Sequence, residues 1–283
     1  MTRPVPVLEP GWPEGFRAAV AMTFDVDAES AVLAVDPGYE RRPSLMSHQR
    51  YGPRVGVPRL LRLLEERGVR ATFFVPGATA DRHPEAVSAI VEAGHEVAHH
   101  GYLHEPLTGR SEAEERAFLE RGLEALDRVA GVRPAGYRAP WWELGEHTLA
   151  LLQELGFAYD SSMFDGDAPY LAGAGAGGLV EVPVSWALDD WERYAFWPDL
   201  TGSGVIARPS EVLEAWWEEI EALVEVGGCA VPTMHPFLSG RPSRARALGT
   251  LLDRILELGD VWVATCGEIA AHTAHRLGQA PRG

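Results

Sequence analysis

Short apolar runs alternate with longer segments of helical periodicity along most of this chain, and the alternation limits the folds that it can adopt. Residues 18–24 are almost entirely apolar and predict a buried strand. Residues 55–67 then have the spacing of an amphipathic helix that ends at Gly68. Repeated strand-then-helix units imply a parallel sheet covered by helices, and their recurrence along the chain favours a closed α/β barrel over an open sheet.

The same reasoning places the remaining elements. Further strands are expected at residues 71–75, 96–98, 136–138, 157–159, 179–184, 229–234 and 261–264. Further helices are expected at residues 84–93, from residue 111 onward, and at 146–155, 210–226, 243–258 and 267–275. Ser111 with Glu114 three residues later predicts a capping box. We expect one domain over residues 1–283, with a core from about residue 17 to residue 270.

Two stretches depart from the barrel pattern. Residues 28–54, which include Tyr51, are expected to form a long loop, and residues 172–178 are almost entirely glycine and alanine. Long loops in compact domains often serve as lids, binding loops or subunit contacts, so either stretch is a candidate for such a role. A disordered insertion is the alternative for both.

Composition and charge exclude some classes of partner. The chain has 41 acidic and 25 basic residues, a net charge of −16, and its basic residues are scattered, which argues against nucleic acid and anionic membranes. No run reaches transmembrane length, and residues 1–16 lack the apolar stretch of a secretory signal, so a cytoplasmic location is expected. Cys229 and Cys266 are expected to be buried reduced thiols, although a disulfide stays open.

Polar residues stand at the ends of several expected strands, where barrels place their catalytic groups. They are Asp25, Asp27, His100, His104, Arg138, Asp160 and His235. Alone, His100 and His104 are weak evidence for a metal site, because two histidines on a solvated loop have the same spacing. Asp27 adds an oxygen to the two nitrogens and completes a three-ligand set that leaves one position open on zinc; cobalt, manganese or nickel would also fit.

The other strand-end residues have separate roles available. Asp25 is a candidate general base that accepts a proton from a metal-activated water, and His235 is a candidate acid that protonates a leaving nitrogen. Arg138 is expected to hold Asp25 by a bidentate contact, and Asp160 to orient Arg138 or His235. The alternatives are that one aspartate caps a turn and that Arg138 forms an ordinary surface salt bridge.

Aromatic residues lie close to these candidates in the sequence. The chain has nine tryptophans, and Trp141, Trp142 and Trp186 follow expected strands while Tyr51 lies in the long loop. Aromatic walls suit sugar rings and flat cyclic amides, so these four residues are candidate substrate contacts. Core packing is the alternative for each of them.

Five segments, taken in order, resemble the polysaccharide deacetylase superfamily, the carbohydrate esterase 4 or NodB-like group, from about residue 17 to residue 269. The segments are 23–27, 94–104, 138–141, 160–162 with 165–169, and 234–236. The resemblance implies a distorted (β/α)₇ barrel and metal-dependent cleavage of a non-peptide C–N bond. It also implies that Asp25 is the base, that Asp27, His100 and His104 bind the metal, and that His235 is the acid.

Several departures from the family pattern bear on the substrate. Val26 separates two aspartates that are usually adjacent, and Gly101 and Leu103 replace small hydroxyl residues. With residues 51–56 and 240–243, this pattern is similar to a branch that contains the Helicobacter-type peptidoglycan deacetylase and bacterial cyclic imide hydrolases. Metal-free allantoinases lie nearby, but the retained metal ligands argue against them. The branch implies a homo-oligomer.

The leading hypothesis is therefore a zinc-type amidohydrolase that removes an acetyl group from an amino sugar or a related saccharide amide. Hydrolysis of a small cyclic imide or ureide is the close alternative. A carbohydrate-binding barrel without catalysis is a minor alternative, because it predicts a missing catalytic element and none is missing.

Overall fold

The strands of the barrel are short, and nearly all of their residues are buried. The computed structural model describes residues 11–172, 178–197 and 205–278. The strands are β1 (Ala18–Val20), β2 (Thr23–Asp25), β3 (Thr72–Val75), β4 (Glu96–His99), β5 (Gly136–Tyr137), β6 (Tyr159–Asp160), β7 (Tyr170–Ala172), β8 (Leu179–Glu181), β9 (Cys229–Ala230), β10 (Thr233–Met234) and β11 (Val261–Val263). The expected glycine and alanine stretch lies largely outside the described residues.

Parallel pairing joins these strands into a distorted (β/α)₇ barrel, as the sequence predicts. One sheet has the order β10-β2-β3-β4-β5-β6-β8-β7 and the other the order β11-β1-β9. The two expected strands at 18–24 and 229–234 are each interrupted, so that β1 and β2 continue one another, as do β9 and β10. An isolated parallel bridge between Asp189 and Thr233 connects the segment after β8 to β10 and closes the barrel. Only β7 pairs antiparallel among the described strands.

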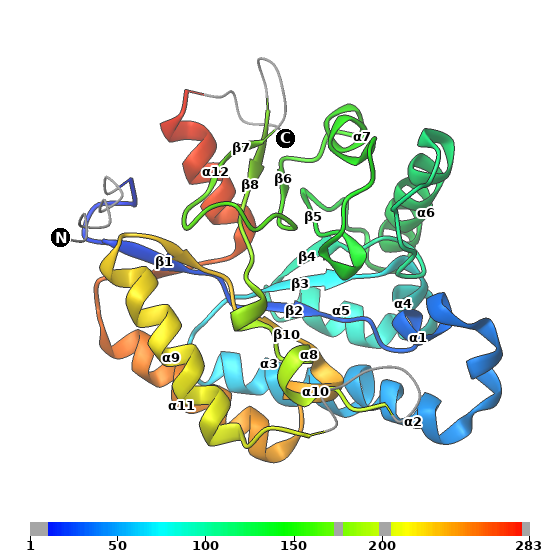
Figure 1. The fold of residues 1–283 in the computed structure, drawn as a ribbon, viewed down its shortest axis with the longest axis horizontal. Coiled ribbons are helices and arrows are strands. Elements are labelled where there is room, and N and C mark those ends of the chain that lie inside the picture. The colour runs from blue at the N-terminus through cyan, green and yellow to red at the C-terminus, as the bar shows by residue number, and fades with distance from the viewer. Residues whose placement is uncertain (1–10, 173–177, 198–204, 279–283) are drawn as a thin grey trace.

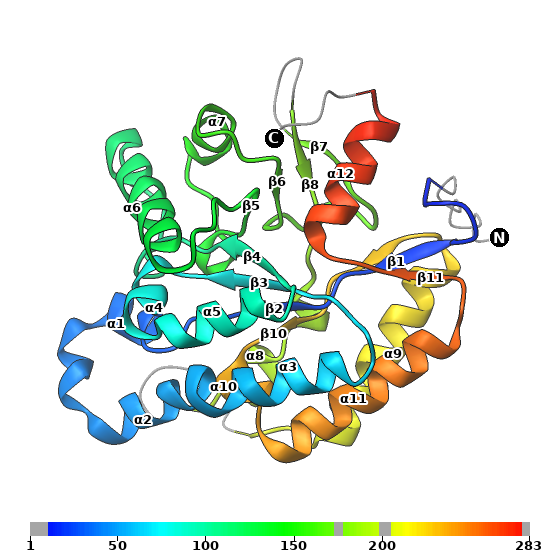
Figure 2. The ribbon, with the colours of Figure 1, turned by 180° about the vertical axis from the view of Figure 1, so that it is seen from behind.

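Helices cover the outside of the barrel, as Figures 1 and 2 show, with α9 and α11 side by side. The helices are α1 (Ser30–Val35), α2 (Pro43–Tyr51), α3 (Val57–Glu65), α4 (Gly77–Arg82), α5 (Pro84–Glu92), α6 (Glu112–Ala130), α7 (Thr148–Glu154), α8 (Trp191–Tyr194), α9 (Pro209–Glu225), α10 (Pro236–Ser239), α11 (Pro242–Glu257) and α12 (Cys266–Arg276). Shorter helical turns are η1 (Pro37–Arg41), η2 (Gly52–Gly56), η3 (Pro140–Trp142) and η4 (Trp186–Leu188).

The expectation of a long loop at residues 28–54 is wrong, because the segment is largely helical. It contains α1, η1, α2 and the start of η2. Pro37 and Pro43 each lie in the first turn of one of these helices. Proline is tolerated there, because the missing N–H group has no partner within the helix at that position.

Alternate residues of the strands face two different layers of the core, as the period-two geometry of a strand requires. Phe24 and Phe73 stack on each other with ring centroids 4.8 Å apart and pack among residues of α3, α9 and α11. Their neighbours face the other way: Phe74 joins Ala98 and Val180 in the second cluster. The outer cluster, with Phe24 and Phe73, packs against the helices. The inner cluster, with Phe74, lies inside the barrel and also contains Trp142, a residue of the site described below.

Two further expectations concern the cysteines and the membrane. Cys229 and Cys266 are both free and buried, as expected, and burial raises the pKa of the Cys266 thiol to about 12. In the part of the chain that the structure describes, no helix has both the length and the apolar character needed to cross a membrane.

The capping box at the start of α6 generates a prediction of stability. The Ser111 hydroxyl accepts a hydrogen bond from Glu114 N, and the Glu114 carboxylate accepts one from Ser111 N at 2.9 Å, as the sequence predicts. Ser111→Ala should lower the free energy of unfolding by about 1 kcal/mol, measured by denaturant titration. Ser47→Ala is the control: Ser47 is exposed inside α2 and caps no helix, so its replacement should cost nothing. An equal loss in both variants would contradict the capping role.

Candidate active site

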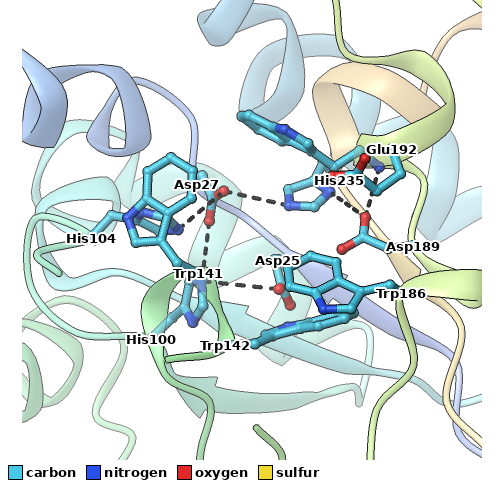
Figure 3. A pocket seen from close by; sticks show the side chains of 11 residues that line it. Asp25, Asp27, His100, His104, Trp141, Trp142, Trp186, Asp189, Glu192 and His235 are labelled. Atoms are coloured by element: carbon cyan, nitrogen blue, oxygen red, sulfur yellow. Dashed lines mark hydrogen bonds and ion pairs between the residues drawn. The ribbon is translucent and has the colours of Figure 1, made fainter. Parts of the chain in front are cut away.

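A cavity of about 460 Å³ opens at the carboxyl ends of the strands, where the sequence places the candidate residues. Figure 3 shows its wall, which combines three aspartates, a glutamate, three histidines and four tryptophans. The lining residues are Asp25, Asp27, His100, His104, Trp141, Trp142, Trp186, Asp189, Trp191, Glu192 and His235. Most of the candidates therefore meet in one place, although they come from distant parts of the chain.

Asp27 lies between the two histidines that the sequence pairs with it. His100 Nε2 is 3.5 Å from Asp27 Oδ1, and His104 Nε2 is 3.6 Å from Asp27 Oδ2. The Nδ1 atom of His100 donates to the backbone oxygen of Arg138 at 2.8 Å, so the Nε2 lone pair of the neutral ring faces Asp27. The three residues form a group whose ligand atoms all lie within 4.8 Å of one another.

The charges in this group fit a bound cation. Burial lowers the pKa of His100 to about 3 and that of His104 well below its ordinary value, so both rings are neutral. Burial also raises the pKa of Asp27 to about 7, against the opposing effect of His235, and Asp27 Oδ1 has no hydrogen-bond partner. Two lone pairs and a carboxylate that face one another repel unless positive charge lies between them. Two nitrogens and one oxygen are a donor set for zinc and similar ions.

Arg138 holds Asp25, but by one hydrogen bond rather than the expected bidentate contact. Arg138 Nη1 donates to Asp25 Oδ1 at 2.7 Å, and neither side chain is more than slightly exposed. The remaining donors of Arg138 bind elsewhere: Nη1 also reaches Thr23 Oγ1, while Nε and Nη2 donate to the oxygens of Ser161. The second oxygen of Asp25 is therefore left facing the cavity, 3.9 Å from His100 Nε2.

His235 is held by an aspartate that the sequence reasoning missed. His235 Nδ1 lies 2.7 Å from Asp190 Oδ1, and the His235 backbone N–H donates to both oxygens of Asp190 at 3.0 Å. His235 Nε2 then points across the cavity and lies 3.6 Å from Asp27 Oδ2. Burial alone would lower the pKa of His235, but the hydrogen bond and charge of Asp190, with Asp189, raise it to about 10. The ring is therefore charged at neutral pH and can donate a proton.

The three candidate tryptophans line the cavity, whereas Tyr51 does not. Trp142 and Trp186 have ring centroids 4.5 Å apart, and the Trp141 ring lies 4.9 Å from the His104 ring. Trp191, from α8, forms the wall next to His235 at 5.2 Å. Tyr51 belongs to α2 and stacks under the Arg241 guanidinium, 3.6 Å from its ring centroid. Tyr51 lies outside the cavity because it is the last residue of α2, which packs against η2 and α10.

Asp160 also lies away from the cavity, and its contacts do not include Arg138 or His235. Its carboxylate accepts from Ser162 Oγ at 2.8 Å and lies next to Glu181 on the neighbouring strand. Tyr159 faces the inner core cluster, so the following residue points to the opposite side of the sheet. Asp160 forms no hydrogen bond with Arg138 or His235, so the orienting role expected for it could act on Arg138 only indirectly, through Ser162 and Ala139.

Backbone strain is concentrated at this site. Among the described residues, the non-glycine positions with positive φ are Ala28 (48°), His104 (62°), Trp141 (61°) and Trp142 (54°). Each of these residues lines the cavity or is adjacent to Asp27 in the chain. Such conformations cost free energy and persist only where surrounding contacts enforce them, and they are typical of binding sites.

Comparisons with known proteins identify the family of this chain. The model of the polysaccharide deacetylase family matches residues 17–159. The peptidoglycan deacetylase of Helicobacter pylori is 31% identical over 277 residues, which cover 89% of this chain and 94% of the relative.

Solved structures give the same result. A crystal structure described as a candidate polysaccharide deacetylase from Mycobacterium smegmatis is 53% identical, with a TM-score of 0.93 over 99% of this chain and 97% of the other. The Puue allantoinase structure, at 24% identity and a TM-score of 0.82 over 97% and 98% of the two chains, shares the fold. On this sequence and structural similarity, the chain belongs to the polysaccharide deacetylase family.

Proposed function

We propose that this protein is a metal-dependent hydrolase that removes the acetyl group from an N-acetylated amino sugar or a related saccharide amide. The observation that carries the proposal is the arrangement around Asp27 in Figure 3. The candidate metal group of Asp27, His100 and His104 lies between a carboxylate held by arginine and an imidazolium held by aspartate. The names of the relatives support the substrate class, since they include peptidoglycan and chitin deacetylases.

Asp25 and His235 divide the proton transfers between them. Asp25 is ready to accept a proton, because Arg138 stabilises its carboxylate and one oxygen faces the cavity. A water molecule that loses its proton to Asp25 attacks the amide carbon. His235 then donates a proton to the leaving nitrogen, and Asp190 keeps the ring oriented for this transfer. The products are a free amine and acetate.

The metal is proposed to be zinc. A divalent cation held by Asp27, His100 and His104 would polarise the amide carbonyl and lower the pKa of a water molecule beside Asp25. Two imidazoles and one carboxylate with a free position are typical of catalytic zinc, and cobalt, manganese or nickel accept the same donors.

The tryptophans are proposed to bind the substrate ring. Trp141, Trp142 and Trp186 give the cavity flat apolar walls, against which the C–H faces of a sugar can pack. The whole chain would then act as one catalytic domain, in keeping with the length over which it matches the Helicobacter relative. Assembly into a homo-oligomer is part of the same proposal and rests on the branch that the sequence resembles.

A second candidate function is hydrolysis of a small cyclic imide or ureide. The volume of the cavity favours it, because about 460 Å³ lies within the range of pockets that enclose a single small ligand. The same catalytic groups would serve, since ring opening also requires attack on an amide carbon and protonation of nitrogen.

A paired substrate panel tests the proposal. Protein stripped of metal and reloaded with zinc is assayed with chitooligosaccharides for acetate release, and with succinimide, hydantoin and allantoin for ring opening. We expect zinc-dependent acetate release. Ring opening without acetate release would instead support the second candidate. No turnover, together with unchanged thermal stability after chelation, would contradict both and favour a binding barrel.

Substitution of the proton-transfer residues tests their roles. Asp25→Asn and His235→Ala should each lower kcat by on the order of 10²–10⁴-fold, because each removes a positioned base or acid. The asparagine keeps a hydrogen-bond acceptor for Arg138, and Asp25 is outside the proposed ligand set. The zinc content of Asp25→Asn should therefore match that of the unsubstituted protein, as measured by elemental analysis. Wild-type kcat in either variant would refute its assigned role.

Removal of a proposed ligand tests the metal site. Removing a group that only hydrogen-bonds to a metal ligand lowers metal affinity by about 10–100-fold. His104→Ala removes a proposed ligand itself, so it should lower zinc affinity by more than that. Competition with a chromophoric chelator measures the affinity. His95→Gln is the matched control, since His95 lies outside the cavity and accepts a hydrogen bond from Ala71 N. Equal zinc affinity in His104→Ala and the control would argue against the site.

A further inference from the structure

We propose that Glu181, a residue outside the cavity, is a positioning residue that holds the catalytic pair of Asp25 and Arg138 in place through the turn at residues 161–163. The inference rests on the proposed roles of Asp25 and Arg138. It assigns a role in the reaction to a carboxylate that has no contact with the cavity and belongs to none of the motifs found in the sequence.

The register of three strands places Glu181 behind the site. Tyr137 of β5 is paired with Asp160 of β6, which is paired with Glu181 of β8, so the three side chains lie in a row on one side of the sheet. Arg138 follows Tyr137 and therefore points to the opposite side, toward Asp25. Asp160, Glu181 and Arg138 are all completely buried.

Glu181 fixes the turn by two backbone hydrogen bonds. Its Oε1 atom accepts from Ser162 N at 2.9 Å and from Met163 N at 3.0 Å. Asp160 adds a third contact, because its Oδ1 accepts from Ser162 Oγ at 2.8 Å. The turn therefore depends on carboxylates of two neighbouring strands, since a buried N–H group without a partner is costly.

The turn at residues 161–163 holds the side chain of Arg138. Arg138 Nε donates to the backbone oxygen of Ser161 at 3.0 Å, and Arg138 Nη2 donates to Ser161 Oγ at the same distance. Ser162 Oγ also accepts from Ala139 N at 2.9 Å, which fixes the backbone next to Arg138. These bonds leave Nη1 directed at Asp25, so a displaced turn would displace the guanidinium and with it the proposed base.

A shared proton allows these two buried acids to lie side by side. Burial raises the pKa of Asp160, and it raises that of Glu181 well above its ordinary value, where the adjacent Asp160 adds to the effect. The remaining oxygens, Asp160 Oδ2 and Glu181 Oε2, have no other partner. A proton on Glu181 that bonds to Asp160 satisfies both. An amide at position 181 would preserve this pattern, since its oxygen accepts and its nitrogen donates.

Glu181→Ala and Glu181→Gln, loaded with zinc, test the inference. A displacement of about 1 Å at a catalytic group can cost 10²-fold in rate, so kcat for acetate release should fall by on the order of 10²-fold in Glu181→Ala, with KM unchanged. Glu181→Gln should restore kcat to near the wild-type value. Glu115→Ala is the matched control, because Glu115 is also a buried glutamate that binds the start of α7, at His147 and Thr148, and it forms no hydrogen bond with Arg138.

A second measurement does not depend on turnover. The Arg138 Nε–H proton, assigned in a ¹H–¹⁵N spectrum by its loss in Arg138→Lys, should exchange slowly with solvent in the wild type and in Glu181→Gln. It should exchange faster in Glu181→Ala. If no panel substrate is turned over, this loss of protection still supports the positioning role while the proposed function fails.

Several outcomes would overturn the inference. A folded Glu181→Ala variant with wild-type kcat and a protected Arg138 proton would do so, as would an equal loss of kcat in Glu115→Ala. If Glu181→Gln loses as much kcat as Glu181→Ala, the shared proton between Glu181 and Asp160 would be contradicted. If Glu181→Ala does not fold, Ser162→Ala takes its place, because it breaks the link between Ala139 and Asp160, and the same two measurements apply.

Discussion

A completely buried guanidinium, that of Arg138, is the interaction on which the rest of the site depends. Burial of a charge is costly unless it is paired and fully hydrogen-bonded, and the barrel supplies those partners from β2, from β10 and from the turn after β6. The Phe74 ring lies beneath it, with its centroid 3.9 Å from the guanidinium carbon. One side chain therefore joins several parts of the barrel, and it also binds Asp25 at the edge of the cavity.

The histidines of the cavity differ in charge, because their surroundings shift their pKa values in opposite directions. His100 and His104 are neutral and turn lone pairs toward Asp27, whereas His235 is charged because Asp190 and Asp189 face it. The three rings lie within one pocket, and burial with different neighbouring groups gives them different charges. A backbone oxygen next to His100 and a carboxylate next to His235 suit the different roles proposed for them, metal ligand and proton donor.

The sequence predicted the elements whose signals are local. Alternating strands and helices, the Ser111 capping box and the polar residues at strand ends all depend on neighbours in the chain, and the structure contains them. Asp190 and Glu181 were missed because their partners come from other strands, although the acidic pair at 189–190 is a visible signal. The position of Asp160 outside the cavity was not predicted, because it depends on β6 including both Tyr159 and Asp160, whose side chains point to opposite sides of the sheet.

The bridge that closes the barrel has a consequence for its motions. Asp189 and Thr233 form an isolated pair, and the next residue, Asp190, donates its N–H to Thr233 O and receives the hydrogen bonds of His235. The seam of the barrel and the support of His235 are thus one set of bonds. Regions with few ladder hydrogen bonds open first in native proteins. Each opening of this seam would also free the His235 imidazole from Asp190. The fraction of molecules with a closed barrel would therefore equal the fraction in which His235 is held in place for its proposed role.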